Sequence, residues 1–99
     1  MNINSLMQQA QKMQRDITKK QEEINSMEFV GSSEWVEIVL SGDKKVKSIN
    51  IKNKVNMDEE DLECLEDMFK IAFNDALNKI DSEVEKKMGA YSKMAGGLF

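Results

Sequence analysis

The first 28 residues carry a seven-residue repeat of apolar positions, which predicts a long helix over residues 1–28. Apolar side chains recur at alternating spacings of three and four residues, and one lysine interrupts the series. The repeat positions are Ile3, Leu6, Ala10, Met13, Ile17, Lys20, Ile24 and Met27. These positions form a narrow apolar stripe along the helix, which we call the seam. So narrow a stripe favours packing along one other helix, in this chain or in a second copy. An amphipathic helix lying on its own sheet is the alternative.

After residue 28 the apolar pattern changes from a helical period to alternation, which predicts a sheet within residues 29–55. A weak first strand spans residues 29–33 and is interrupted by Gly31. A clearer strand follows at residues 35–40, where the apolar residues of one face are Val36, Ile38 and Leu40.

The composition of residues 41–44 predicts a turn, in which Gly42 is able to take a positive φ. A third strand is expected at residues 46–51. Val46 is out of phase with the later isoleucines of this strand, which indicates a bulge or a late start. Three strands joined by short turns predict an antiparallel meander.

A second long helix is predicted over residues 57–88. Asn56 is the expected N-cap, with Glu59 three residues later completing a capping box. At 1.5 Å per residue the helix would be roughly 45 Å long, more than a small globule can cover. Gly89 is expected to end it, and residues 89–99 to form a flexible tail.

These elements predict one α+β domain over residues 1–99, built as long helix, three-stranded antiparallel sheet and long helix. A small sheet can cover only part of the apolar face of two long helices. The uncovered surface predicts a symmetric homodimer.

The composition argues against an enzyme. The chain has no histidine, which removes the commonest general base and metal ligand, and its one cysteine, Cys64, cannot form an internal disulfide. No phosphate-binding glycine loop is present, and the acidic residues 58–61 are explained by their place in a first helical turn. We therefore expect no catalytic residue, metal, cofactor or small-molecule substrate.

The charges are unevenly distributed. The chain has 14 basic and 18 acidic residues, a net charge of −4, and residues 58–99 alone carry five lysines against eleven acids. The first helix places Lys12, Arg15 and Lys19 on one face, away from the seam, and Lys20 of the seam gives weaker support. Such a stripe can neutralise backbone phosphates, although a solvated surface has the same appearance. Lysines within residues 44–54 and 86–93 form weaker candidate clusters.

The N-terminal residues show neither a signal-peptide pattern nor an apolar run of the roughly 20 residues that would span a bilayer. We expect a cytoplasmic protein without a membrane partner.

Two sequence blocks resemble the YbaB/EbfC family of bacterial nucleoid-associated proteins. They are the LMQQAQKMQ block at residues 6–14 and the NDALNK block at residues 74–79, and weaker similarity covers nearly the whole chain. The resemblance implies an intertwined homodimer with helices projecting like the arms of tweezers. It also implies binding of duplex DNA with weak sequence preference, in nucleoid organisation or gene regulation.

The predicted function is therefore that of a dimeric nucleoid-associated protein that contacts DNA mainly through phosphates. The predicted DNA-binding residues come from the basic residues of the first helix: Lys12, Arg15, Lys19 and Lys20. The alternative is a dimeric protein–protein adaptor that binds no nucleic acid and uses its acidic second helix to meet a basic partner.

Overall fold

The computed structural model of the chain describes residues 2–53 and 56–94. Its elements confirm the predicted order of helix, three-stranded sheet and helix. They are α1 (Ile3–Ser26), β1 (Glu28–Ser32), β2 (Val36–Ser41), β3 (Val46–Ile51) and α2 (Glu59–Met94).

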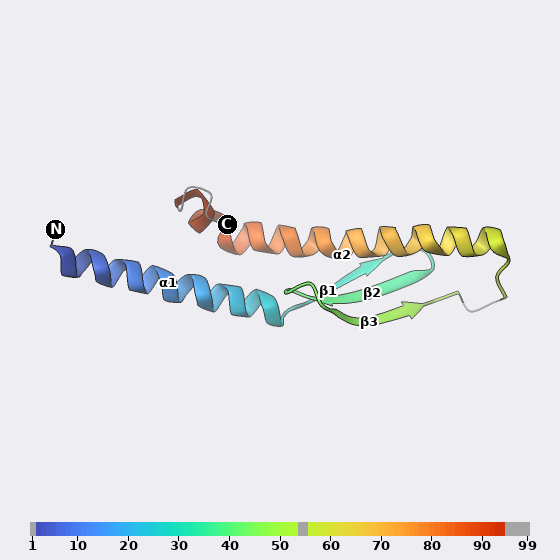
Figure 1. Cartoon of the computed structure of the whole chain (residues 1–99), viewed down its shortest axis with the longest axis horizontal. Coiled ribbons are helices and arrows are strands. Elements are labelled where there is room, and N and C mark those ends of the chain that lie inside the picture. Colours follow the sequence, from blue (N-terminus) through green and yellow to red (C-terminus); the bar gives the residue numbers. More distant parts are fainter. Residues whose placement is uncertain (1, 54–55, 95–99) are drawn as a thin grey trace.

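The molecule is strongly elongated. Its extents are 71 × 21 × 14 Å and its radius of gyration is 19.5 Å, against about 13 Å for a compact chain of 100 residues. The sheet lies along the middle of α2, whereas α1 projects beyond the sheet on the side away from the start of α2 (Figure 1). The chain therefore has a packed body and a projecting helical arm.

The sheet is an antiparallel meander in the order β1-β2-β3. Ser48 pairs with Val39, but Val46 pairs with the next residue, Leu40, so Lys47 is the extra residue of a bulge. This bulge is the one that the phase of Val46 predicts.

The turn between β2 and β3 differs from the prediction in its backbone. Lys44 has the positive φ, 65°, whereas Gly42 is outside the left-handed region. Gly42 is required because a β-carbon there would collide with the carbonyl group of Ile24 at the end of α1. Its amide donates a hydrogen bond to the carbonyl oxygen of Met27, at 3.0 Å. The end of α1 thus packs directly against this turn.

The start of α2 corrects the predicted N-cap. The amide of Asp61 donates to Oδ1 of Asp58 at 2.9 Å, and the amide of Asp58 donates to Oδ2 of Asp61 at 3.1 Å. These reciprocal bonds form a capping box at Asp58, so Asn56 is not the cap. The two carboxylates together satisfy backbone donors at the positive end of the helix, where negative charge is favoured.

The end of α2 also differs from the prediction. The helix continues through Gly89 to Met94, because Met88 and Gly89 are buried and their packing outweighs the helix-breaking tendency of glycine, about 1 kcal/mol. Residues 89–94 are therefore helical rather than a flexible tail. The rest of that predicted tail, residues 95–99, lies outside the described residues.

The core lies between α2 and the first two strands. Gly31 of β1 packs directly on the α2 backbone at Ala72 and Ala76, with no room for a side chain. The other buried members of this core are Phe29, Val36, Ile38, Leu40 and Ile80. The predicted inward face of β2 is thus confirmed.

Within the described part of the chain, no helix covers the third strand. Ile49 pairs with Ile38, and Val46 with Leu40, so these residues lie on the same face of the sheet. Yet Ile49 is 48% exposed and Val46 50%, whereas their partners are buried. The inner face of the sheet is therefore covered over β1 and β2 but open over β3.

Among the described residues, the arm contacts the body near its C-terminal end. Ile24 is fully buried and is the buried residue of α1. Lys87 of α2 lies 3.9 Å from the carboxylate of Glu23 and 3.5 Å from that of Glu83. The helix thus does not lie along its own sheet, which was the alternative interpretation of its pattern.

Candidate nucleic-acid interface

Three of the predicted residues form an exposed stripe on the arm. The helix begins at Asn2, whose side chain accepts a hydrogen bond from the amide of Ser5 at 2.8 Å. Lys12, Arg15 and Lys19 follow at helical spacing on one face, and all three are exposed. Within residues 2–53 and 56–94 they take part in no ion pair. We call these three residues the basic stripe.

The fourth predicted residue, Lys20, lies on a different face. It occupies a position of the apolar repeat and is half-buried, so its stem lies along the seam rather than on the basic stripe. The structure therefore brings together three of the four predicted residues.

The lysines of the weaker clusters differ in their surroundings. Lys44, Lys45 and Lys47 are exposed at the hairpin, with Lys45 3.7 Å from the carboxylate of Asp43. Lys52 donates a hydrogen bond to the carbonyl oxygen of Ser33 at 2.9 Å. Lys87 is tied to two carboxylates where α1 meets α2. Among the described residues, Lys52 and Lys87 thus have structural contacts that the basic stripe lacks.

The charges of the molecule are separated along its length. Residues 2–20 contain four basic residues and one acidic residue, whereas residues 58–67 contain seven acidic residues and no basic one. The arm and the start of α2 lie at opposite ends of the molecule (Figure 1), which is 71 Å long. Since exposed charges are screened beyond about 8–10 Å, the net charge of −4 does not describe the arm.

Comparison with known proteins decides the family. A model of the YbaB/EbfC DNA-binding family matches residues 1–98. The chain belongs to this family. Similar proteins include those named "nucleoid-associated protein" in Streptococcus pneumoniae strains Hungary19A-6, CGSP14 and TIGR4. Each is 46% identical over 94 residues, which cover 93% of this chain and 94% of the relative.

The NDALNK block of this YbaB/EbfC protein holds the outer edge of the sheet. Lys79 donates a hydrogen bond to the carbonyl oxygen of Val30 at 2.7 Å, and Asp75 accepts one from the amide of Ser32 at 3.0 Å. Their own charged groups are 3.5 Å apart. The hydrogen bond from Ser32 is the main cause that lowers the pKa of Asp75, and the charge of Lys79 adds to it. We call this pair the edge clamp.

Sequence reasoning did not identify the edge clamp as a structural feature. The available signal was an acid and a lysine four residues apart around Ala76, a spacing that places them on the side of α2 that packs on β1. The free strand edge that they cover is visible only in the fold.

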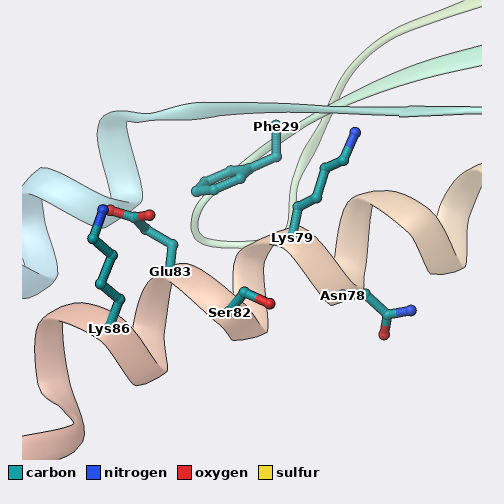
Figure 2. Close-up of a pocket in the computed structure, with 6 residues that line it drawn as sticks. All are labelled: Phe29, Asn78, Lys79, Ser82, Glu83 and Lys86. Carbon is teal, nitrogen blue, oxygen red and sulfur yellow. The ribbon is translucent and has the colours of Figure 1, made fainter.

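A shallow groove beside the edge clamp adds no reactive group. It has a volume of about 440 Å³ and lies between the start of β1 and α2. Figure 2 shows Phe29 and Lys79 in the space between the strand and the helix, whereas Asn78 points away. The other lining residues are Ser82, Glu83 and Lys86. This is a surface depression with mixed charges.

Other chemical features of the described residues give no alternative site. Cys64 is exposed in the acidic part of α2. Among residues 2–53 and 56–94, no three potential metal ligands gather around a common point, and no helix in this part of the chain is long and apolar enough to cross a membrane.

Proposed function

We propose that this YbaB/EbfC protein is a dimeric, nucleoid-associated protein that binds duplex DNA through the basic stripe, with little preference for sequence. The observation that supports this is the exposure of Lys12, Arg15 and Lys19 on a projecting helix, where they form no ion pair with any described residue. Their site of action would be the bacterial nucleoid, in the cytoplasm, where the protein organises DNA or regulates genes.

The chemistry of the stripe favours phosphates over bases. Lysine and arginine on one helical face can follow the charged backbone of a duplex without contacting base edges. Because such contacts release counterions, they make binding strongly dependent on salt and nearly independent of sequence. The separation of the acidic residues 58–67 from the arm keeps repulsion of the phosphates weak.

The open sheet face supports the dimer. The edge clamp covers one edge of the sheet at β1, whereas β3 is an exposed edge strand with apolar side chains at Val46 and Ile49. An uncovered edge of this kind readily pairs with another chain. We propose that a second copy covers β3.

The decisive experiment replaces the basic stripe by alanine, in the triple variant Lys12→Ala, Arg15→Ala, Lys19→Ala. Each phosphate contact adds about 0.9 to the slope of log K against log salt, and a dimer has at most six such side chains. We expect weaker binding on every duplex sequence and a flatter salt slope, measured by fluorescence anisotropy. Thermal stability should change little, since exposed substitutions usually cost under about 0.5 kcal/mol.

A matched control removes the same charge elsewhere, in the variant Lys44→Ala, Lys45→Ala, Lys47→Ala. This variant should retain most of the affinity and the salt slope of the wild type. Unchanged affinity and slope in the stripe variant would refute the proposed site, and loss in the control would assign DNA binding to the hairpin.

A second candidate function is that of a protein–protein adaptor. The observation that favours it is the acidic segment 58–67, in which Leu62 is 49% exposed. Absence of DNA binding by the wild type at low salt would support this alternative over the proposed one.

A further inference from the structure

The arm carries an apolar surface that the described part of the chain, residues 2–53 and 56–94, leaves largely exposed. It consists of the first five positions of the heptad repeat, which we call the arm seam: Ile3, Leu6, Ala10, Met13 and Ile17. Ile3 is 74% exposed, Leu6 48% and Met13 36%, whereas Ile17, the last of the five, is half-buried. Isolated exposed apolar residues are ordinary on protein surfaces, but these follow a single stripe.

The fold buries one end of the heptad repeat and leaves the other end exposed. Beyond Lys20 the repeat continues into the body, where Ile24 is fully buried and Met27 half-buried. Before Lys20 it lies on the part of α1 that projects away from the sheet and α2 (Figure 1). The open half thus continues a helix-packing surface that the chain already uses at its other end.

The flanks of the arm seam permit a second copy of the same surface to pack on it. The residues beside the seam are Met7, Gln9, Gln14 and Asp16, so only one of them is charged. The basic stripe lies on the opposite face of the helix. Two arms can therefore approach without bringing their lysines and arginines together, and like-charge repulsion is avoided.

We propose that the arm seam of one molecule pairs with the arm seam of a second copy, and that this contact is separate from the β3 surface. The contact spans 15 residues, about 22 Å of helix. So short a helical pair is marginal by itself, but a dimer has two arms, and linked contacts reinforce one another. Paired arms link dimers into larger assemblies.

This arrangement gives the assembly a DNA-bridging activity, a consequence that rests on the proposed function. Pairing through the seam leaves the basic stripe of each arm facing outwards. Two linked dimers then present stripes to two duplexes at once. Self-association and bridging thus depend on the arm seam, whereas binding of a single duplex depends on the basic stripe.

Cysteine cross-linking tests the contact directly. In a Cys64→Ser background, Ala10→Cys places a thiol at the centre of the seam, where it meets its counterpart whether the arms run parallel or antiparallel. Gln8→Cys places a thiol on the opposite face as a control. A short bis-maleimide should join chains through position 10 at least about tenfold more efficiently than through position 8. Equal efficiencies would overturn the proposal.

A second variant separates the contact from DNA binding. Leu6→Gln with Met13→Gln alters exposed side chains, so the monomer fold should persist by circular dichroism. Sedimentation should show loss of assemblies larger than a dimer. Capture of a free duplex on a bead-bound duplex should fall at least about tenfold, while affinity for a single duplex stays unchanged.

The two proposals fail in different ways. Wild-type protein that never exceeds a dimer at any concentration, or a Leu6/Met13 variant that still forms the larger assemblies, refutes arm pairing and leaves the basic stripe untouched. Wild-type protein that forms seam-dependent assemblies but binds no duplex refutes the DNA-binding function and supports arm pairing.

Discussion

The substitution Gly31→Ala should be strongly destabilising because it introduces an atom where β1 and α2 already touch. A β-carbon at residue 31 would lie 2.6 Å from the amide nitrogen of Ala76, 2.7 Å from its β-carbon, and closer still to the carbonyl oxygen of Ala72. Ordinary van der Waals contacts of a β-carbon begin near 3.4 Å. Two of these three obstacles are backbone atoms of a helix, so no side-chain rotation can relieve the clash.

The size of the expected loss of stability follows from the distance by which the new methyl group pushes β1 away from α2. The strand must move away from α2 by more than half an ångström, which opens the contact along the core residues on both sides. Overpacking of a well-packed core costs typically 1–3 kcal/mol, and we expect about 3 kcal/mol here because the backbone cannot yield. A domain of this size loses about 4–8 °C of Tm for each kcal/mol, so Tm should fall by about 12–24 °C.

The same substitution at Gly89 is a matched control, for which we expect a change in stability of the opposite sign. There a β-carbon would lie 3.0 Å from a carboxylate oxygen of Glu85, the end of a flexible side chain. Since alanine is favoured over glycine within a helix by up to about 1 kcal/mol, Gly89→Ala should stabilise the protein slightly. Both variants are measured by circular dichroism during thermal and urea unfolding, at one fixed chain concentration because self-association raises apparent stability.

A Gly31→Ala protein as stable as the wild type would refute this reasoning. So would a Gly89→Ala protein that loses more stability than Gly31→Ala. Either result would mean that the close contact of β1 with α2 does not fix the packing of the sheet.

Three further predictions concern the second helix. Asp58→Ala should lower the free energy of unfolding by about 1 kcal/mol through loss of the cap, whereas Asn56→Ala should change it by less than about 0.5 kcal/mol; equal effects in urea titrations would contradict the observed cap. Cys64→Ser should leave DNA affinity unchanged in anisotropy titrations, and loss of binding would contradict a site on the arm. The hydrogen bond from Ser32 keeps the pKa of Asp75 in the folded chain below its ordinary value of 3.8. The contribution of the ionised Asp75 carboxylate to the stability of the fold is thus present above pH 3.8 and is lost as the pH falls through the folded-state pKa. As the pH falls below 3.8, the Asp75→Asn variant should lose less free energy of unfolding than the wild type. Equal slopes of the free energy of unfolding against pH for the two proteins would contradict this.

Local periodicity was sufficient to predict the elements. The heptad repeat located α1, and alternation located β2, because each regular structure repeats its side-chain directions over a few residues. The phase of Val46 even revealed the bulge in β3. The family resemblance, seen chiefly in two short blocks, implied the same fold. The match of the family model over residues 1–98 confirmed the resemblance, and the element order confirmed the fold.

Element ends were less predictable, because neighbouring residues offer equivalent local signals. Asn56 and Asp58 each have an acidic residue three positions later, so both fit a capping box; in the fold Asp58 makes the reciprocal bonds. Gly89 has the character of a helix end, but burial of that turn carries α2 past it.

The candidate site was likewise predictable only in part. Helical spacing alone placed Lys12, Arg15 and Lys19 on one face, since residues three, four and seven apart are neighbours on any helix. The same spacing put Lys20 at a position of the apolar repeat, and in the fold Lys20 is half-buried there. Helical spacing could not assign Lys79 to a strand edge 49 residues away in the chain.

The sequence by itself determined the helices, the strands, their apolar faces and the separation of basic from acidic segments, because all of these depend on residues close together in the chain. Only the tertiary structure decided which apolar positions are covered. Leu6 and Ile24 are equivalent in the heptad repeat, yet one is exposed and the other buried; Ile38 and Ile49 are partners in the sheet and differ in the same way. Burial depends on which distant segment packs over a residue. The residues of α2 pack on Ile38 and the turn at Gly42 packs on Ile24, whereas Leu6 and Ile49 are left exposed.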